Sequence, residues 1–120
     1  MFLCRLNGHE ILTMGSMNFI ERELEGLRPD VLLAGAGASR TEIHDYTKRL
    51  LTATGFPRFV IPTHWDNFYV PYENDAAQVQ ARKEKAEPFM KEASAVAPRS
   101  DVIIPVLLQP IIIPNVPTER

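Results

Sequence analysis

The sequence has little cysteine and no surplus of positive charge. Its single cysteine, Cys4, excludes a disulfide bond within the chain. Its 120 residues include 13 Lys and Arg against 15 Asp and Glu, which gives a net charge of −2. A surface that binds nucleic acids in general needs clustered Lys and Arg side chains to contact the phosphates. We therefore expect no nucleic-acid partner.

The sequence also lacks a long hydrophobic run. Prolines interrupt its apolar stretches, which stay far below the ~20 residues that cross a bilayer. The N-terminal residues lack the charged segment and the apolar block of a secretory signal. We expect no membrane partner, and the cytoplasm is the default expectation for its location. A chain of this length forms one domain or part of one.

Strand and helix patterns alternate along the chain. Asn7-Gly8 lies between two apolar segments, at 2–6 and 10–14, and this arrangement is typical of an antiparallel hairpin. Apolar spacing at the helical period and unbroken apolar runs predict the remaining elements. These are helices at 17–27, 39–54 and 76–96, and buried strands at 30–34 and 59–61.

Capping residues mark the ends of the first two predicted helices. Asn18 with Glu21, and Ser39 with Glu42, have the spacing of a capping box, in which two side chains bind the free N–H groups of the first turn. Gly55 is suited to the left-handed conformation that ends a helix. Both helices are therefore expected to begin at these side-chain caps.

Prolines set further limits. Pro62 is expected to end the strand at 59–61, and Pro88 to interrupt the helical region at 76–96. Prolines also separate the apolar triplets of the C-terminal segment, so we expect short edge strands or extended chain there, with a Pro-rich tail at 105–120. The order of strands and helices indicates a layered α/β architecture.

The segment richest in chemically useful side chains follows the second buried strand. His64 offers an imidazole, a common metal ligand and general base, and Asp66 is suited to orient it or to bind a metal itself. Trp65 and Phe68 are suited to a pocket wall, and Asn67 to a contact with substrate. Strand-end loops often carry ligand groups in α/β proteins. The alternative is a loop anchored by its aromatics, in which His64 is only hydrogen-bonded.

Two other segments follow predicted strands and carry candidates. Ser16, after Gly15, either approaches a site or caps the next helix. Residues 35–40 join a strand to a helix start, where free N–H groups and the Arg40 guanidinium are suited to an anion. This segment matches neither a Rossmann fingerprint nor a Walker loop. The alternative there is a flexible turn with a helix cap.

Three segments together resemble a known family: Ile-Leu-Thr-Met-Gly-Ser at 11–16, Arg-Pro-Asp-Val-Leu-Leu at 28–33, and Pro-Thr-His-Trp-Asp-Asn-Phe at 62–68. Over residues 2–114 the chain resembles the C-terminal half of metallo-β-lactamase-fold hydrolases. The branch it resembles most includes the ascorbate-6-phosphate-lactonase-like proteins. The resemblance implies an α/β fold, half of a four-layer αβ/βα sandwich, with one or two metal ions, usually zinc, at one edge of the sheets.

The resemblance also implies roles for individual residues. His64 matches the family's final metal-binding His, and Ser16 stands where the family has a metal-bridging Asp. Asp66 would then support catalysis, while Trp65 and Tyr69 would line the substrate mouth with their neighbours in the loop. The family's main metal motif, His-x-His-x-Asp-His, is absent from the sequence. Because a zinc site takes three or four protein ligands, we expect weak zinc binding or none in this chain alone.

These implications define the main hypothesis and its alternatives. The main hypothesis is a partial domain over 1–120 of a zinc-dependent hydrolase, from a longer protein or a truncated reading frame, and inactive alone. Its substrate would be a small molecule with a lactone, phosphodiester or amide bond. Open sheet edges would favour self-association or pairing with a missing N-terminal half. The alternatives are a non-catalytic interaction domain and an anion-binding module that uses Gly35 to Arg40.

Overall fold

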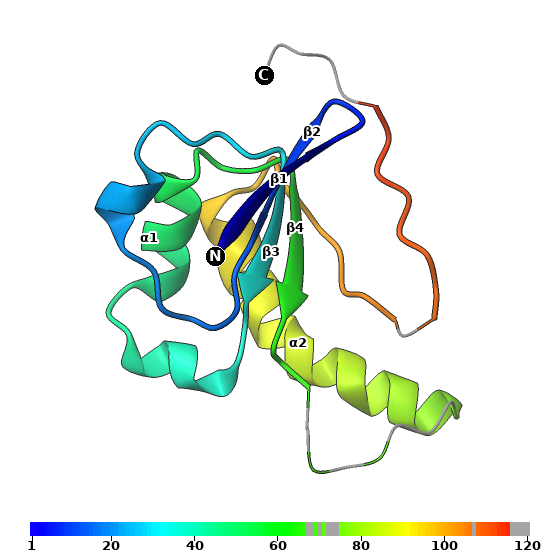
Figure 1. The fold of residues 1–120 in the computed structure, drawn as a ribbon. Helices are drawn as coiled ribbons and strands as arrows, with labels where there is room; N and C mark the ends of the chain where they lie inside the picture. The colour runs from blue at the N-terminus through cyan, green and yellow to red at the C-terminus, as the bar shows by residue number, and fades with distance from the viewer. Residues whose placement is uncertain (67–68, 70, 72–74, 107, 116–120) are drawn as a thin grey trace.

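The computed structural model describes residues 1–66, 69, 71, 75–106 and 108–115, and five strands, two α-helices and two 3₁₀-helices lie within them (Figure 1). The strands are β1 (Phe2–Leu6), β2 (His9–Thr13), β3 (Val31–Gly35), β4 (Phe59–Thr63) and β5 (Asp101–Val102). The α-helices are α1 (Tyr46–Ala53) and α2 (Ala76–Val96), and the 3₁₀-helices are η1 (Glu21–Leu24) and η2 (Ala38–Glu42).

The strands form one mixed sheet in the order β1-β2-β3-β4-β5. β1 is antiparallel to β2, and the other neighbouring pairs are parallel. The predicted hairpin is confirmed: Asn7 and Gly8 have φ angles of 50° and 81°, the left-handed values that a tight two-residue turn requires. The parallel strands β2, β3 and β4 therefore present their carboxyl ends at one edge of the sheet.

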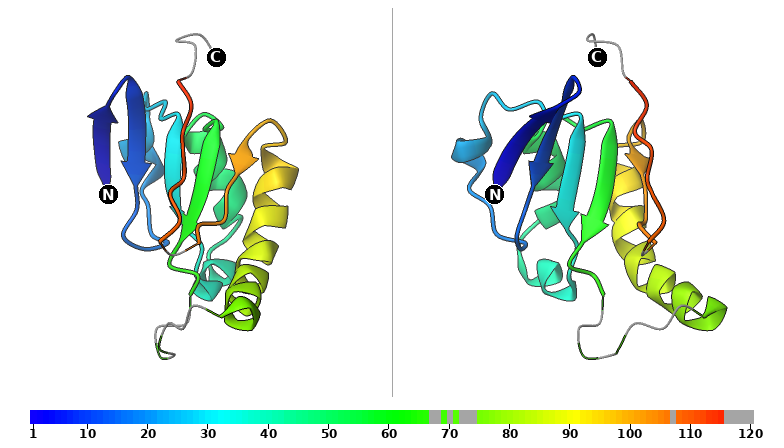
Figure 2. Two further views of the ribbon diagram at one scale, coloured as in Figure 1. Left: turned by 90° about the vertical axis from the view of Figure 1, so that its right-hand side faces the viewer. Right: turned by 45° about the vertical axis from the view of Figure 1, so that its right-hand side comes forward.

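Helices cover one face of the sheet. Leu12, Leu32 and Val60 point from the strands into a core that Leu50 of α1 and Phe89 of α2 complete, and all five are almost fully buried. The helical segments between successive parallel strands lie on this same side (Figure 2). Burying these side chains contributes about 1.5–3 kcal/mol each, so this layer is the main source of stability.

The opposite face of the sheet is also apolar, and the C-terminal segment covers it. Val31, Phe59 and Ile61 are buried there, and isoleucines of the segment after β5 pack against them: Ile103, Ile111 and Ile113. Figure 2 shows this segment crossing the sheet on the side away from the helices. The architecture is therefore a mixed α/β fold, with a five-stranded sheet between a helical layer and an extended segment.

Both predicted N-terminal helices are shorter than the apolar spacing indicated. In place of the helix at 17–27 only the 3₁₀ turn η1 forms, and Ile20, not Asn18, precedes it. The helix at 39–54 is divided into η2 and α1 by Asp45, whose φ of 46° is left-handed. Asp is one of the few residues that tolerates the left-handed backbone state found at position 45. Neither predicted capping box forms, because Ile20 and Gly37 directly precede the two 3₁₀-helices and neither makes a side-chain capping bond.

Two prolines that were expected to end or interrupt an element lie within continuous elements. β4 runs through Pro62 to Thr63, because β5 pairs with β4 only at Phe59 and Val60 and so needs no donor from Pro62. The helix α2 continues through Pro88 as one element, with Pro88 itself exposed. Within the described part of the chain, no helix has both the length and the apolar character that a membrane crossing requires.

A buried hydrogen-bonded pair, His9 and Asp30, joins the hairpin to the start of β3 at the other end of the strands. The Asp30 carboxylate accepts hydrogen bonds from His9 Nδ1 and from the Glu10 N–H, the latter at 2.5 Å. Both side chains are buried. Burial by itself would raise the pKa of Asp30, but the bonds from His9 and Glu10 outweigh it and hold that pKa below the ordinary 3.8.

This pair predicts a pH-dependent stability. Because the pKa of Asp30 is lower in the folded chain, its contribution is complete above 3.8 and is lost as the pH falls through the depressed value. We expect Asp30→Asn to lower the free energy of unfolding by roughly 1–3 kcal/mol near neutral pH, and less in acid. Denaturant unfolding across a pH series measures it. The exposed β5 variant Asp101→Asn is the control, and equal losses in both variants would contradict the assignment.

Candidate functional site

Three chain segments meet at the carboxyl edge of the parallel strands. The Met14 N–H donates to Leu33 O at 3.2 Å, and the Ala36 N–H donates to Thr63 O at 2.8 Å, so the three strand ends are tied in register. A Cβ atom on Gly35 would lie 2.5 Å from the Ser16 carbonyl oxygen. The approach of these chains thus requires glycine at position 35.

The structure brings the predicted residues Ser16 and His64 to this same edge. A Cβ on Gly37 would lie 2.9 Å from the His64 carbonyl oxygen, so the backbone of Gly37 lies against that of His64, as Gly35 lies against that of Ser16. Ser16 and His64 are both exposed. His64 has a φ of 60°, a left-handed value that is uncommon outside glycine and that clusters at functional sites.

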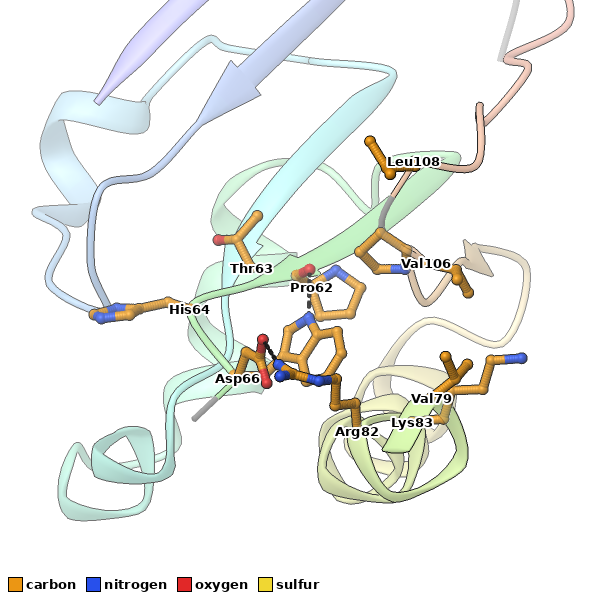
Figure 3. Close-up of a pocket in the computed structure, with 11 residues that line it drawn as sticks. Pro62, Thr63, His64, Asp66, Val79, Arg82, Lys83, Val106 and Leu108 are labelled. Atoms are coloured by element: carbon orange, nitrogen blue, oxygen red, sulfur yellow. Dashed lines mark hydrogen bonds and ion pairs between the residues drawn. The ribbon is translucent and has the colours of Figure 1, made fainter. Parts of the chain in front are cut away.

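A cavity of 490 Å³ opens beside His64, between the end of β4, the first half of α2 and the segment after β5. Its walls are mainly apolar and include Trp65, Val79 and Val106 (Figure 3). The Trp65 ring is fixed by its Nε1–H, which donates to Pro62 O at 3.0 Å. Pockets of this size with few polar groups are suited to small molecules.

Asp66 lies in the cavity wall and forms an ion pair with Arg82 of α2. Arg82 also donates to Pro71 O at 3.4 Å, which ties the loop after β4 to the helix. In Figure 3 the imidazole of His64 extends to the opposite side of the backbone from the Asp66 carboxylate. Asp66 therefore shapes the cavity through Arg82, and its expected support of His64 stays a prediction.

The contribution of α2 to the cavity was not predicted from the sequence. Val79, Arg82 and Lys83 line it, and Lys83 appears in the sequence as part of a run of alternating charges. The spacing of i, i+3 and i+4 places these three side chains on one helix face. The sequence therefore indicates that these three side chains share a face of the helix. It does not indicate which loop that face packs against.

Arg40 has a different setting from the one the anion hypothesis needs. Its side chain is buried, and it donates to both carboxylate oxygens of Glu92 and, at 3.3 Å, to the carbonyls of Ala36 and Gly37. Burial alone would raise the pKa of Glu92, but bonds from Arg40 and Thr47 lower it overall. Arg40 thus fixes the 35–40 turn to α2, and this geometry does not favour a substrate or anion contact.

Tyr46 is a second positioning residue that the sequence indicated only as core. Its buried hydroxyl donates to Gly35 O at 2.7 Å, at the point where the strand ends converge. Burial raises the pKa of this phenol well above its ordinary value of 10.0, so it stays a neutral donor. Tyr46 and Arg40 together hold the backbone of residues 35–37.

The remaining predicted site residues are less informative. Tyr69 is 96% exposed. Asn67 and Phe68, predicted to contact substrate, lie outside the described residues. Among the residues that the structure describes, no group of three or more His, Cys, Asp or Glu side chains is placed to hold a metal. The predicted ligands His64 and Ser16 supply one imidazole and one hydroxyl, fewer than the three or four protein ligands of a zinc site.

The Arg40 contacts predict a structural effect. Arg40→Ala removes the guanidinium that binds the Glu92 carboxylate and the buried carbonyls of Ala36 and Gly37, and Glu92 keeps only its bond from Thr47. We therefore expect a loss of roughly 1–3 kcal/mol in the free energy of unfolding. Arg40→Lys restores little of it, because an ammonium cannot make the two-point contact. Denaturant unfolding measures both, with Arg49→Ala at a more exposed ion pair as control. Phosphate-dependent stabilisation of the wild type that vanishes in Arg40→Ala would instead favour the anion hypothesis.

Comparison with models of protein families, with curated proteins and with solved structures gives no match in any of the three. The mixed α/β fold and the geometry of the strand ends therefore carry the functional argument alone. The resemblance of residues 11–16, 28–33 and 62–68 to metallo-β-lactamase-fold hydrolases remains a hypothesis.

Proposed function

We propose that this chain is part of a metallo-β-lactamase-like hydrolase, in which it supplies His64 and a substrate-binding cavity and is inactive alone. The observation that carries this proposal is the position of His64. His64 follows β4 with a left-handed backbone, beside Gly37 and at the same sheet edge as Ser16. It borders a 490 Å³ cavity, and its imidazole extends to the other side of the backbone from Asp66 (Figure 3). An exposed side chain on a left-handed backbone at the carboxyl edge of parallel strands is the placement expected of a functional group.

In this proposal the described residues have separate roles in metal binding and in substrate binding. His64 offers one imidazole nitrogen as a metal ligand, and Ser16 a hydroxyl at the same edge. Trp65 and Val79 hold the apolar body of a small substrate, and Lys83, at the rim of the cavity, pairs with an acidic group on it. The substrate class is therefore a small molecule with an apolar body and one negative charge, carrying the bond to be hydrolysed.

The other metal ligands would come from the second half of a four-layer αβ/βα sandwich. The apolar face of the sheet is consistent with such a second layer. Val31, Phe59 and Ile61 bury their side chains there against the extended C-terminal segment, and Leu33 and Ile11 beside them are only partly buried. This finer architecture is part of the proposal.

Zinc binding tests the role of His64. We expect the chain to bind zinc in the micromolar range or more weakly, with affinity falling as the pH is lowered because a protonated imidazole cannot act as a ligand. His64→Ala should weaken this binding further, whereas His44→Ala, at an exposed position on the loop before α1, should not. Titration calorimetry measures all three proteins. Tight stoichiometric zinc binding that His64→Ala leaves unchanged would contradict the proposal.

Ligand binding tests the cavity independently of metal. Trp65 is the single tryptophan of the chain, so its fluorescence reports on this cavity. We expect the apolar anion anilinonaphthalene sulfonate to quench Trp65, and Lys83→Glu to weaken its binding by roughly threefold to tenfold. Lys91→Glu, on the same helix but exposed and outside the cavity lining, is the matched control. Equal affinities for the two variants, or no change in Trp65 emission, would contradict the ligand class.

A non-catalytic interaction domain is the second candidate, and the exposed outer strand β1 favours it. Four of its five residues are exposed, among them Phe2 and Leu6. The two candidates differ in what a variant at position 64 changes. An interaction domain would keep its partner in His64→Ala, whereas a hydrolase half would lose its metal ligand.

A further inference from the structure

The outer edge of β1 is unpaired among the described residues, since β1 ends the strand order of the sheet. Its side chains alternate between the two faces. Leu3 packs against the helical core, whereas Phe2, Cys4 and Leu6 lie on the other face and are exposed, with 73% of Phe2 and 62% of Leu6 accessible. An apolar edge strand of this kind is a template for pairing with another strand.

The hydrogen bonds of β2 determine which backbone groups of β1 do not take part in the β1–β2 pairing. Asp30 N donates to Glu10 O and Met14 N to Leu33 O, so the even-numbered residues of β2 bond to β3. The odd-numbered residues of β2 therefore bond to β1, where they face Phe2, Cys4 and Leu6. The N–H and C=O groups of Leu3 and Arg5 consequently point outward from the sheet.

This pattern is complementary to itself. We propose that a second copy of the chain pairs with β1 antiparallel, about a two-fold axis at Cys4. Leu3 of each copy then lies opposite Arg5 of the other, and their outward groups exchange hydrogen bonds. Cys4 faces Cys4, and Phe2 faces Leu6, so all exposed apolar side chains of the strand gain partners on one face.

Charge does not oppose pairing between two copies. Arg5 is the only charged residue of β1, and its Nε donates to its own Glu10 at 3.1 Å. Two copies therefore meet without an uncompensated pair of like charges. Five residues per strand give a small interface, so the dimer is expected to be weak and reversible. This inference does not depend on the proposed hydrolase function.

Thiol cross-linking tests the register. In this arrangement the two Cys4 residues form a non-hydrogen-bonded pair with Cα atoms about 4.5 Å apart, within the range for a disulfide. Diamide, which accepts the two hydrogens of the thiols, should join wild-type chains at least about tenfold faster than Cys4→Ser/Ser94→Cys, whose thiol lies on the exposed face of α2. Equal rates in the two proteins would mean random collision and would overturn the proposal.

Two more variants distinguish this register from other pairings. Cys4→Ser/Leu6→Cys should cross-link poorly with itself but readily with Cys4→Ser/Phe2→Cys, because residues 2 and 6 lie opposite each other only in the proposed pairing. Efficient cross-linking of Leu6→Cys with itself, or none between the two variants, would overturn it. The result is independent of zinc and of His64, so its failure leaves the hydrolase proposal standing.

The backbone of β1 supplies a separate test without cysteine chemistry. Arg5→Pro removes an outward N–H that the β1–β2 ladder does not use, whereas Arg5→Ala keeps it. In sedimentation over a concentration series, we expect a dimer for wild type and Arg5→Ala, and only monomer for Arg5→Pro with an unchanged circular dichroism spectrum. A wild-type monomer throughout, or a dimer that persists in folded Arg5→Pro, would overturn the proposal.

Discussion

The close approach of three backbones at the carboxyl edge of the sheet is the constraint on which the rest of this structure depends. Gly35 lies against the Ser16 carbonyl and Gly37 against the His64 carbonyl, at distances that leave no room for a Cβ atom. Because these chains touch directly, the loops after β2, β3 and β4 cannot move independently. The exposed groups at the edge are thereby held in one fixed arrangement.

Two buried arginines extend this constraint to the helix α2. Arg40 binds Glu92 and the carbonyls of residues 36 and 37, and Arg82 binds Asp66 in the loop after β4. The same helix therefore fixes both sides of the edge, and it also provides one wall of the cavity. A buried charge without its partner is costly, so these contacts specify where the loops lie as well as adding stability.

The sheet surrounding this edge has three different environments. Its helical face carries the main core, and its other face is covered by an extended segment. Its outer strand β1 has no further strand beside it in the part of the chain that the structure describes. An enzyme site and an interaction surface would occupy separate parts of such a molecule, since the edge at His64 and the edge at β1 share no residue. The two proposals can thus hold together or fail separately.

The sequence alone determined the elements whose signals are local. Asn7-Gly8 predicted the hairpin, because both residues tolerate the left-handed conformation of a tight turn. Unbroken apolar runs predicted β3 and β4, because a strand covered on both faces carries few polar side chains. The family resemblance also implied that Ser16 and His64 lie at one sheet edge, because both match positions of the family's metal ligands. The left-handed turn at Asp45 went unrecognised, because the helical spacing of apolar residues continues across it.

Only the tertiary structure decided what the charged side chains do. Arg40 and Glu92 are 52 residues apart in sequence, and Asp66 and Arg82 are 16 apart, so no local pattern indicates that they pair. The cavity likewise forms only where the loop after β4, the helix α2 and the segment after β5 meet. Spacing along a chain predicts which face a side chain occupies, but packing determines which distant segment that face contacts.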